Sequence, residues 1–270
     1  MAASSRARVW AAQRAVLALG AVGASHRSVL ELASVTGVDL GVPHPWGVRI
    51  SAGAVLPTDD DASTALAWCR ERGAANGWRV SVPSRLAEQG PWSGLVAHDQ
   101  NGVFALDATA AARIRVDPPD RLDLVADPSH SAVVAAYGGW MSDLPLARLL
   151  VTPADLDRPD RRFVVGVVDG RPVGCAFVWW SGGTAHLSGI GVLADQRGRG
   201  YGRALTAAAV RLAVTGPRQD RRSERPDQPA IVWLLATTAG AGLYARMGFE
   251  RVDTEALLGP GSQPSETEGV

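Results

Sequence analysis

The chain contains no lysine, since all 27 of its basic residues are arginine. A lysine nucleophile, a lysine Schiff base and modification of a lysine side chain are therefore excluded. The formal net charge is zero, whereas a general nucleic-acid binder needs a basic excess to neutralise phosphates. We accordingly expect no nucleic-acid partner.

Cysteine is scarce as well: only Cys69 and Cys175 occur, each inside an apolar pattern. A secreted disulfide scaffold would contain more cysteines, so we expect a reducing, cytoplasmic setting. No stretch reaches the roughly 18 uninterrupted apolar residues of a membrane span, and we expect no membrane partner. The apolar run Ala15–Ala24 faintly resembles a targeting segment, but we favour an ordinary N-terminal helix because the apolar residues around Trp10 fit one helical face.

The length of 270 residues suits one large domain or two domains of ordinary size. The stretch Asp107–Pro119 has few large apolar residues and ends in two prolines, so we place a linker there. This divides the chain into an N-terminal domain at residues 1–117 and a C-terminal domain at residues 118–258. Residues 259–270 are predicted to form a disordered tail.

The second half shows a regular alternation of strands and helices. A strand at Arg121–Ala126 and a helix at Pro128–Met141, with Asp127 as its N-cap, come first. Tight turns at Asp169-Gly170 and Ser181–Gly183 join an antiparallel meander, whose strands are Arg162–Val168, Arg171–Trp180 and Thr184–Leu193. Four elements follow: helix Tyr201–Val214, strand Ile231–Ala236, helix Ala239–Met247 and strand Phe249–Leu257. The fold class is therefore α/β of the α+β type, with a mixed, mostly antiparallel central sheet flanked by helices.

The first half is less regular. Its predicted elements are strand Trp46–Ile50, helix Ala62–Arg72, strand Trp78–Val82, short helix Ser84–Gln89 and a hairpin Gly94–Ala105 turned at Asn101-Gly102. Their order echoes the order from Tyr201 to Leu257. A decayed internal duplication is one interpretation, although no clear residue-level repeat supports it.

The segment from Ile190 to Arg203 combines a strand, a glycine-rich turn and a helix start. Unpaired backbone N–H groups at a helix N-terminus carry the positive end of the helix dipole, so such a turn binds phosphate without a basic side chain. Gly198, Gly200 and Gly202 lack a Cβ atom, which lets a pyrophosphate approach the backbone. A Walker loop needs a lysine, and a dinucleotide fingerprint has a different glycine spacing within a parallel β-α-β unit.

Two motifs in the second half resemble those of the GNAT superfamily of N-acetyltransferases. Arg197-x-x-Gly200-x-Gly202 after an apolar strand is similar to the acetyl-CoA signature of that family. The segment Leu243–Phe249 resembles the Leu-Tyr-x-x-x-Gly-Phe ending of the family. The resemblance covers about Arg121–Leu258 and implies a GNAT-like fold, with a degenerate or tandem GNAT-like first half as an open interpretation.

The resemblance implies acetyl-CoA as co-substrate and no metal. Main-chain groups of Ile190, Gly191 and Val192 would pair with the pantetheine arm. Thr237 stands where many members carry an asparagine that contacts the cofactor, which leaves this contact open. The turn expected at the pyrophosphate consists of Arg197, Gly198, Arg199, Gly200, Tyr201, Gly202 and Arg203.

Tyr244 and His186 are the candidate catalytic residues. Tyr244 occupies the position of a family tyrosine near the thioester sulfur, where its phenol would protonate the departing thiolate; the alternative is an aromatic packed on the sheet. His186 has a suitable ordinary pKa for a base, but a packed histidine, a water chain or an acid from the first half stay open. One of Trp179 and Trp180 should line the acceptor groove, because neighbouring strand residues face opposite sides.

The resemblance therefore predicts a soluble N-acetyltransferase that moves an acetyl group to a primary amine of a small molecule or a protein. A non-catalytic acyl-CoA-binding or sensing protein is the alternative, and an interaction protein built on two such folds is a third. The first half lacks a second glycine-rich signature, so we expect one cofactor site per chain. The sequence leaves monomer and homodimer open.

Overall fold

The computed structural model describes residues 2–19, 27–217 and 229–261. Its helices are α1 Ala2–Leu19, α2 Asp59–Arg72, α3 Ala108–Arg113, α4 His130–Met141, α5 Leu144–Leu150, α6 Pro153–Asp157, α7 Tyr201–Thr215 and α8 Thr238–Arg246. Its strands are β1 Ser28–Glu31, β2 Thr36–Asp39, β3 Val48–Ser51, β4 Arg79–Pro83, β5 Val96–Asp107, β6 Asp123–Ala126, β7 Arg161–Val168, β8 Arg171–Ser181, β9 Thr184–Val192, β10 Ile231–Ala236 and β11 Glu250–Gly259. Short 3₁₀ turns lie at Ser84–Leu86, Gly90–Trp92 and Ala194–Gln196.

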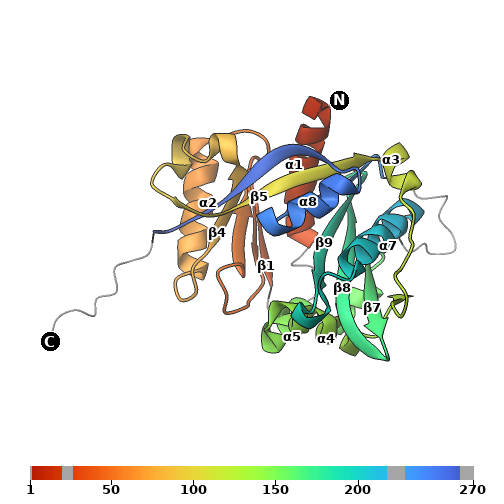
Figure 1. Cartoon of the computed structure of the whole chain (residues 1–270). Coiled ribbons are helices and arrows are strands. Elements are labelled where there is room, and N and C mark those ends of the chain that lie inside the picture. The colour runs from red at the N-terminus through yellow and green to blue at the C-terminus, as the bar shows by residue number, and fades with distance from the viewer. Residues whose placement is uncertain (1, 20–26, 218–228, 262–270) are drawn as a thin grey trace.

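The strands form one sheet in the order β1-β2-β3-β4-β11-β5-β10-β9-β8-β7-β6. Neighbouring strands are antiparallel except for β3 with β4 and β9 with β10. The predicted mixed, mostly antiparallel sheet flanked by helices is thereby confirmed, and Figure 1 shows it running through the whole molecule.

The two halves of the chain exchange strands at the centre of this sheet. Strand β5 of the first half lies between β10 and β11, and β11 of the second half lies between β4 and β5. The predicted hairpin turned at Asn101-Gly102 is wrong, because β5 is a single long strand. Its middle is paired on both edges, with Gly102 opposite Ala236 on one side and Thr254 on the other, so no turn forms there.

The order of elements repeats around this exchange. In the first half β3 is followed by α2 and the parallel strand β4, and in the second half β9 is followed by α7 and the parallel strand β10. This matches the echo seen in the sequence. The domain boundary at residue 117 stays a prediction, since the sheet joins both halves without a break.

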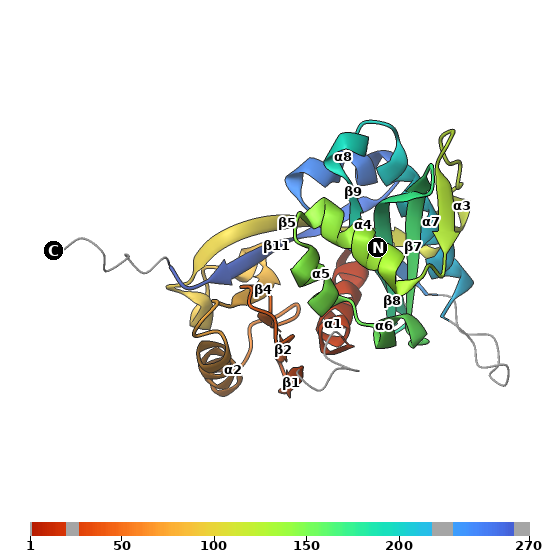
Figure 2. The same cartoon turned by 90° about the horizontal axis from the view of Figure 1, so that it is seen from below.

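Helices cover both faces of the sheet. Helix α7 packs on the face that carries Leu187, Leu234 and Phe104, whereas α4 packs on the opposite face of β7 and β8. Helix α1 lies on the same face as α4 and contacts strands of both halves, as Figure 2 shows. Its buried Trp10 joins Trp233 in the cluster between the halves. The predicted N-terminal helix is confirmed.

A buried ion pair fastens the edge of the first half to the second half. Arg27, just before β1, donates to the carbonyl oxygens of Leu149 (2.9 Å) and Leu150 (3.2 Å) at the end of α5. Its guanidinium also lies 3.7 Å from Asp155 in α6, and Asp155 pairs with Arg161 in β7. These contacts fix β1–β3 opposite α4 and α5.

Two other local predictions are corrected. Ser129, not Asp127, caps α4, because its hydroxyl accepts from the Ala132 N–H at 3.3 Å, while Asp127 has a φ of 55° and pairs with Arg162. The predicted linker contains α3, which packs against α7. Of the predicted tail, residue 259 ends β11 and residues 262–270 lie outside the described part of the chain.

The strand exchange predicts that the two halves cannot fold separately. A chain of residues 118–270 alone would lack β5, leaving β10 and β11 without their shared partner and Trp233 without its cover. We expect this fragment to lack cooperative unfolding when followed by circular dichroism, and to regain it when residues 1–117 are coexpressed. Cooperative, soluble behaviour of the isolated fragment would show that β5 is dispensable.

Candidate active site

The parallel strands β9 and β10 separate partway along their length. They pair from Thr184 to Leu187 of β9 and from Ile231 to Leu234 of β10, while β9 continues to Val192. Beyond Leu187, the edge of β9 that faces β10 therefore makes no sheet hydrogen bonds with it. An extended chain can add to such an edge as a further strand does.

The shape of β9 beyond this point depends on two glycines. Gly189 has a φ of 58° and lies where the register with β8 shifts, which marks a bulge. A Cβ atom on Gly191 would lie 2.2 Å from the Trp140 ring, so α4 packs directly against this backbone. Ile190, Gly191 and Val192 thus sit together on the exposed edge, where the resemblance places the pantetheine arm.

The turn between β9 and α7 presents a row of unused hydrogen-bond donors. The backbone N–H groups of residues 198–203 donate to no described group, and the first printed donor of the helix is Ala204. Gly200 precedes α7 without a side-chain cap, and no acidic residue lies in its first turn. The 15-residue helix therefore directs bare N–H groups and the positive end of its dipole at one point. These residues fit a pyrophosphate.

The glycines of this turn serve different purposes. Gly198 has a φ of 76° and open space where a Cβ atom would lie. Gly200 has a φ of 82°, but a Cβ atom there would meet Pro119 at 3.2 Å. A side chain on Gly200 would therefore press on Pro119, whereas Gly198 is the residue with free space beside it. Gly202 would place a Cβ atom 3.7 Å from Leu243, in ordinary contact.

The arginines around the turn are exposed and differently engaged. Arg197 donates from Nε to the Val192 carbonyl oxygen at 3.1 Å, which ties the turn to the end of β9. Arg199 and Arg203 are exposed on the turn and the first turn of α7. Thr237 is exposed at the start of α8, where its carbonyl accepts from the helix, so its hydroxyl is accessible beside the end of β10.

Tyr244 lies in α8 and is buried, with 7% of its surface exposed. Its ring packs against Phe104 at 6.3 Å and Phe249 at 5.9 Å between centroids. Burial raises the pKa of its phenol to about 12, because a phenolate is poorly solvated there. The hydroxyl makes no hydrogen bond to a described residue and so keeps both a proton and a free donor direction.

His186 lies in β9 on the face that carries α1 and α4. Its ring stacks on Trp233 with centroids 4.1 Å apart, and its Nδ1 is buried without a hydrogen-bond partner among the described residues. Burial and the Arg49 charge lower the pKa of the imidazole to about 3. A group with so low a pKa accepts protons weakly, which favours packing over a base role.

The two neighbouring tryptophans face opposite sides, as strand geometry requires. Trp180 joins the α7-side core and donates to the Ala213 carbonyl oxygen at 3.1 Å. Trp179 faces the other side, directly opposite His186, with the Arg161 guanidinium 3.7 Å from its ring centroid. Trp179 is thus the tryptophan on the face of α1 and α4.

A buried polar cluster on that same face was missed by the sequence analysis. Glu255 of β11 is 2% exposed and accepts from Gln13 of α1 at 2.7 Å and from Asn101 of β5 at 2.8 Å. Ser81 of β4 also donates to Glu255 and receives from Gln13. The final strand carries three acids, Glu250, Asp253 and Glu255, and nothing local marks Glu255 as the buried one. Its partners come from segments distant in sequence.

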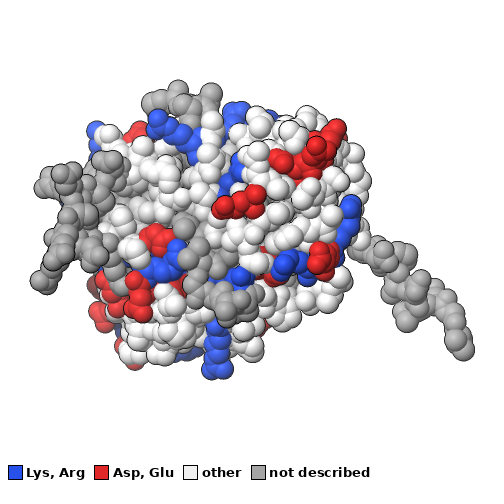
Figure 3. Space-filling view, turned by 180° about the vertical axis from the view of Figure 1, so that it is seen from behind, with Lys and Arg blue, Asp and Glu red and all other residues white. Residues whose placement is uncertain are grey.

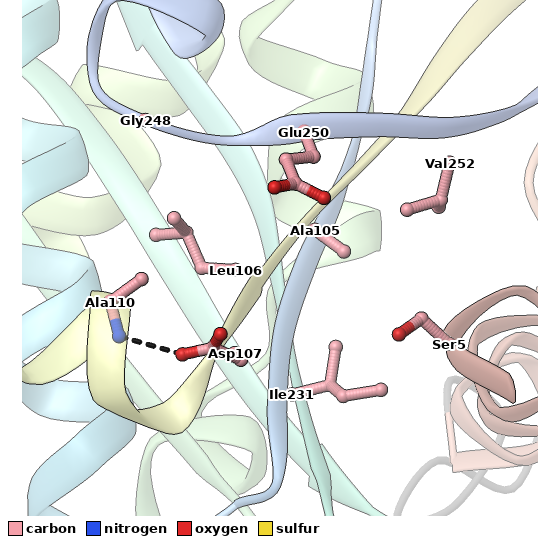
Figure 4. A pocket seen from close by; sticks show the side chains of 9 residues that line it. All are labelled: Ser5, Ala105, Leu106, Asp107, Ala110, Ile231, Gly248, Glu250 and Val252. Atoms are coloured by element: carbon pink, nitrogen blue, oxygen red, sulfur yellow. Dashed lines mark hydrogen bonds between the residues drawn. The ribbon is translucent and has the colours of Figure 1, made fainter. Parts of the chain in front are cut away.

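A separate open pocket lies at the other end of β10, as Figure 4 shows. The Asp107 and Glu250 carboxylates give it acidic character, although Asp107 also caps α3 by accepting from Ala110 N–H at 2.7 Å. It contains none of the predicted site residues, so it does not bear on acyl transfer. Its lining consists of Ser5, Ala105, Leu106, Asp107, Ala110, Ile231, Gly248, Glu250 and Val252.

Other classes of site find little support in the described residues. No group of three or more metal-binding side chains occurs in the described ranges. Burial raises the pKa of the Cys69 thiol to about 12 and that of Cys175 as well, so both are poor nucleophiles. On the face seen in Figure 3 acidic and basic side chains are interspersed. None of the described helices is both long and apolar enough to cross a membrane.

Comparison with known proteins agrees with this geometry. Residues 159–251, from β7 to the start of β11, match the family model described as "Acetyltransferase (GNAT) domain". No curated protein matches the chain. The matched residues contain the splayed strands, the glycine turn and Tyr244.

Several solved structures share the fold. A GCN5-related N-acetyltransferase from Kribbella flavida is 20% identical, with 96% of each chain covered and a TM-score of 0.65. A tandem GNAT protein from the clavulanic acid biosynthesis pathway is 15% identical, with 98% of each chain covered and a TM-score of 0.57. A GCN5-related N-acetyltransferase from Sphaerobacter thermophilus is 18% identical, covering 87% of this chain and 83% of that one, with a TM-score of 0.52. These likenesses extend through both halves, and they establish the fold.

The space beside Gly198 gives a first test of the turn. We expect Gly198→Val to weaken acetyl-CoA binding at least about tenfold in calorimetry, because the new side chain obstructs the N–H groups. Gly170→Val in the β7–β8 turn is the matched control, since Gly170 has a φ of 78° and equally open surroundings. Both variants carry similar backbone strain of about 1–2 kcal/mol. Equal affinity in the two variants would contradict the placement of the phosphate.

The buried imidazole gives a second test. Because the folded pKa of His186 lies near 3 and an unfolded histidine titrates near 6.5, the unfolded state binds more protons between these values. His186 therefore supports stability above about pH 6.5, and this support is lost as the pH falls toward 3. We expect urea unfolding to show a smaller loss of stability between pH 7 and 4 in His186→Gln than in the natural chain. Parallel pH curves would show that His186 titrates normally.

Proposed function

We propose, from the premise that the C-terminal part of this chain is a GNAT domain, that the protein is an N-acetyltransferase. It would move an acetyl group from acetyl-CoA to a primary amine of a small molecule or a protein by direct attack. The observation that carries the proposal is the row of unused N–H donors at residues 198–203, next to the unpaired edge of β9. Both features suit one ligand that has a diphosphate followed by an extended amide chain.

Each part of the site has a role in this proposal. The N–H groups of residues 198–203 hold the pyrophosphate, with Arg197 fixing the turn, and Thr237 offers a further hydrogen bond. The edge at Ile190, Gly191 and Val192 aligns the pantetheine arm. An N–H of β9 near Val192 polarises the thioester carbonyl, and its fixed direction stabilises negative charge as it develops on the oxygen.

Proton transfers at the two ends of the reaction involve different groups. Tyr244 acts as the general acid at the departing sulfur, and its raised pKa ensures that the phenol is protonated when the thiolate leaves. The amine must be neutral to attack, and water removes its proton, because β9 and β10 carry no acidic residue and His186 is a weak proton acceptor.

Two features bear on the number of cofactor sites and on the cellular compartment. The turn before α2 matches the position of the turn before α7, but Thr58 caps α2 and three aspartates occupy its first turn. Negative side chains at that helix start oppose a diphosphate, which supports one cofactor site per chain. The free, buried cysteines suit a cytoplasmic protein.

A non-catalytic acyl-CoA-binding or sensing protein is the second candidate. The absence of acidic residues from β9 and β10 favours it, since some GNAT members place a catalytic glutamate there. The two candidates share the phosphate turn and differ in what Tyr244 does.

Tyr244 therefore decides between them. We expect Tyr244→Phe to lower kcat about 100-fold with a panel of amines, while its calorimetric affinity for acetyl-CoA stays unchanged. Because burial raises the pKa of Tyr244 to about 12, turnover of the natural chain should show no loss from this group as the pH rises to about 10. Unchanged turnover in the variant would remove the general-acid role, and a natural chain that binds acetyl-CoA but acylates no amine would favour the sensing candidate.

A further inference from the structure

Arg49 projects from the first half toward the reactive face of the second half. Its strand neighbours Val48 and Ile50 belong to the core under α2, so Arg49 points to the opposite face, where α1 and α4 lie. There it interacts electrostatically with Glu255 of β11 and Tyr137 of α4. It also affects His186 of β9. Arg49 is thus directed at the side of the sheet opposite α7, close to the point where β9 and β10 separate.

The strand that carries Arg49 is held in place by the framework around it. The contacts of Arg27 with α5 and α6 hold the edge formed by β1, β2 and β3 against the second half. Tyr137 is held in turn by its ring contact with Phe177 of β8, at 4.9 Å between centroids. Arg49 therefore extends from a strand that is anchored to the second half.

The hydrogen-bonding capacity of Arg49 is unused. The guanidinium is half-buried, yet it donates to no described residue, and its side chain forms none of the ion pairs found in the described chain. The nearby Glu255 accepts from Gln13, Ser81 and Asn101 and not from Arg49. Burial lowers the pKa of Arg49, so removing it from water has an energetic cost that an acceptor would offset.

The neighbouring arginine is directed elsewhere. Arg79 of β4 lies opposite Arg49 in the parallel pairing of β3 and β4, but its guanidinium donates to the Trp78 carbonyl oxygen at 2.9 Å and lies beside Gly77 and Gly259. An anion would satisfy the planar donors of Arg49, which no described group occupies.

We propose that Arg49 binds an anionic group on the acceptor, so that the substrates are small primary amines that also carry a carboxylate or a phosphate. This inference rests on the proposed acyl transfer. The anion is distinct from the pyrophosphate of acetyl-CoA, because the N–H groups of residues 198–203 lie at the start of α7, on the other face of the sheet. Arg49 acts as a specificity residue that orients the acceptor with its amine toward the thioester.

The test uses matched amines that differ in charge. The pairs are glycine and glycinamide, 4-aminobutyrate and butylamine, and phosphoethanolamine and ethanolamine. We expect at least one anionic member to exceed its neutral partner about 30-fold in kcat/KM with the natural chain, since a charge-assisted bidentate contact is among the stronger hydrogen bonds. The pair that shows the preference identifies carboxylate or phosphate as the recognised group.

Variants of Arg49 locate the preference. Arg49→Met should abolish it by slowing the anionic amine about 30-fold and the neutral one less than about threefold, with unchanged affinity for acetyl-CoA. Arg49→Lys should give an intermediate result, because it keeps the charge near Glu255 but lacks the planar fork. Arg70→Met on the exposed side of α2 is the control and should behave as the natural chain.

The outcomes separate this inference from the proposed function. Equal rates for anionic and neutral amines, or an equal loss for both in Arg49→Met, would overturn the role of Arg49 while acyl transfer stands. If the natural chain binds no acetyl-CoA, the proposed function fails. Anion binding by Arg49 can then still be tested by thermal unfolding. The anionic amines should raise Tm of the natural chain and of Arg70→Met but not of Arg49→Met. The absence of any such shift would overturn it.

Discussion

The hydrogen-bonded ladder between β5 and β11 is the constraint on which the molecule depends. Each of these strands belongs by sequence to one half, but it also pairs with a strand of the other half. The exchange covers strand edges that would be exposed in a separate half, namely the edge of β4, which pairs with β11, and the edge of β10, which pairs with β5. It also carries Asn101 and Glu255 to the same place, so that residues of both halves form one buried polar cluster.

The geometry of the candidate site depends on this ladder. The central strands hold β10 in place, β9 follows β10 only as far as Leu187, and the resulting gap lies beside the start of α7. The α7 side supplies the unused N–H groups of residues 198–203, and the α1 side supplies the side chains of Arg49, His186 and Tyr137. The two substrates of the proposed reaction thereby meet different surfaces and converge on the edge of β9.

The sequence predicted the second half well because its signals are local. Turn dipeptides such as Asp169-Gly170 and the periodic apolar pattern of Tyr201–Val214 specify elements without knowledge of their neighbours. The hairpin at Asn101-Gly102 failed because pairing on both edges of β5 overrides the turn preference of that dipeptide. The polar cluster and Arg49 were missed for a related reason, since their meaning arises only when α1, β3, β4 and β11 are brought together.

The turn before α2 differs from the turn before α7 in its chemistry. It holds the corresponding place between two parallel strands, but its backbone differs, since Thr58 is extended with a φ of −65° and Gly200 has a φ of 82°. Thr58 also closes the helix start, and Asp59, Asp60 and Asp61 surround it with negative charge. Creating affinity for a diphosphate there would require several coordinated replacements, since any one of them leaves the others opposing the negative charge. Because the glycine turn before α7 lies entirely in the second half, side chains on the β3 face of the first half can differ in charge and shape without altering that helix start.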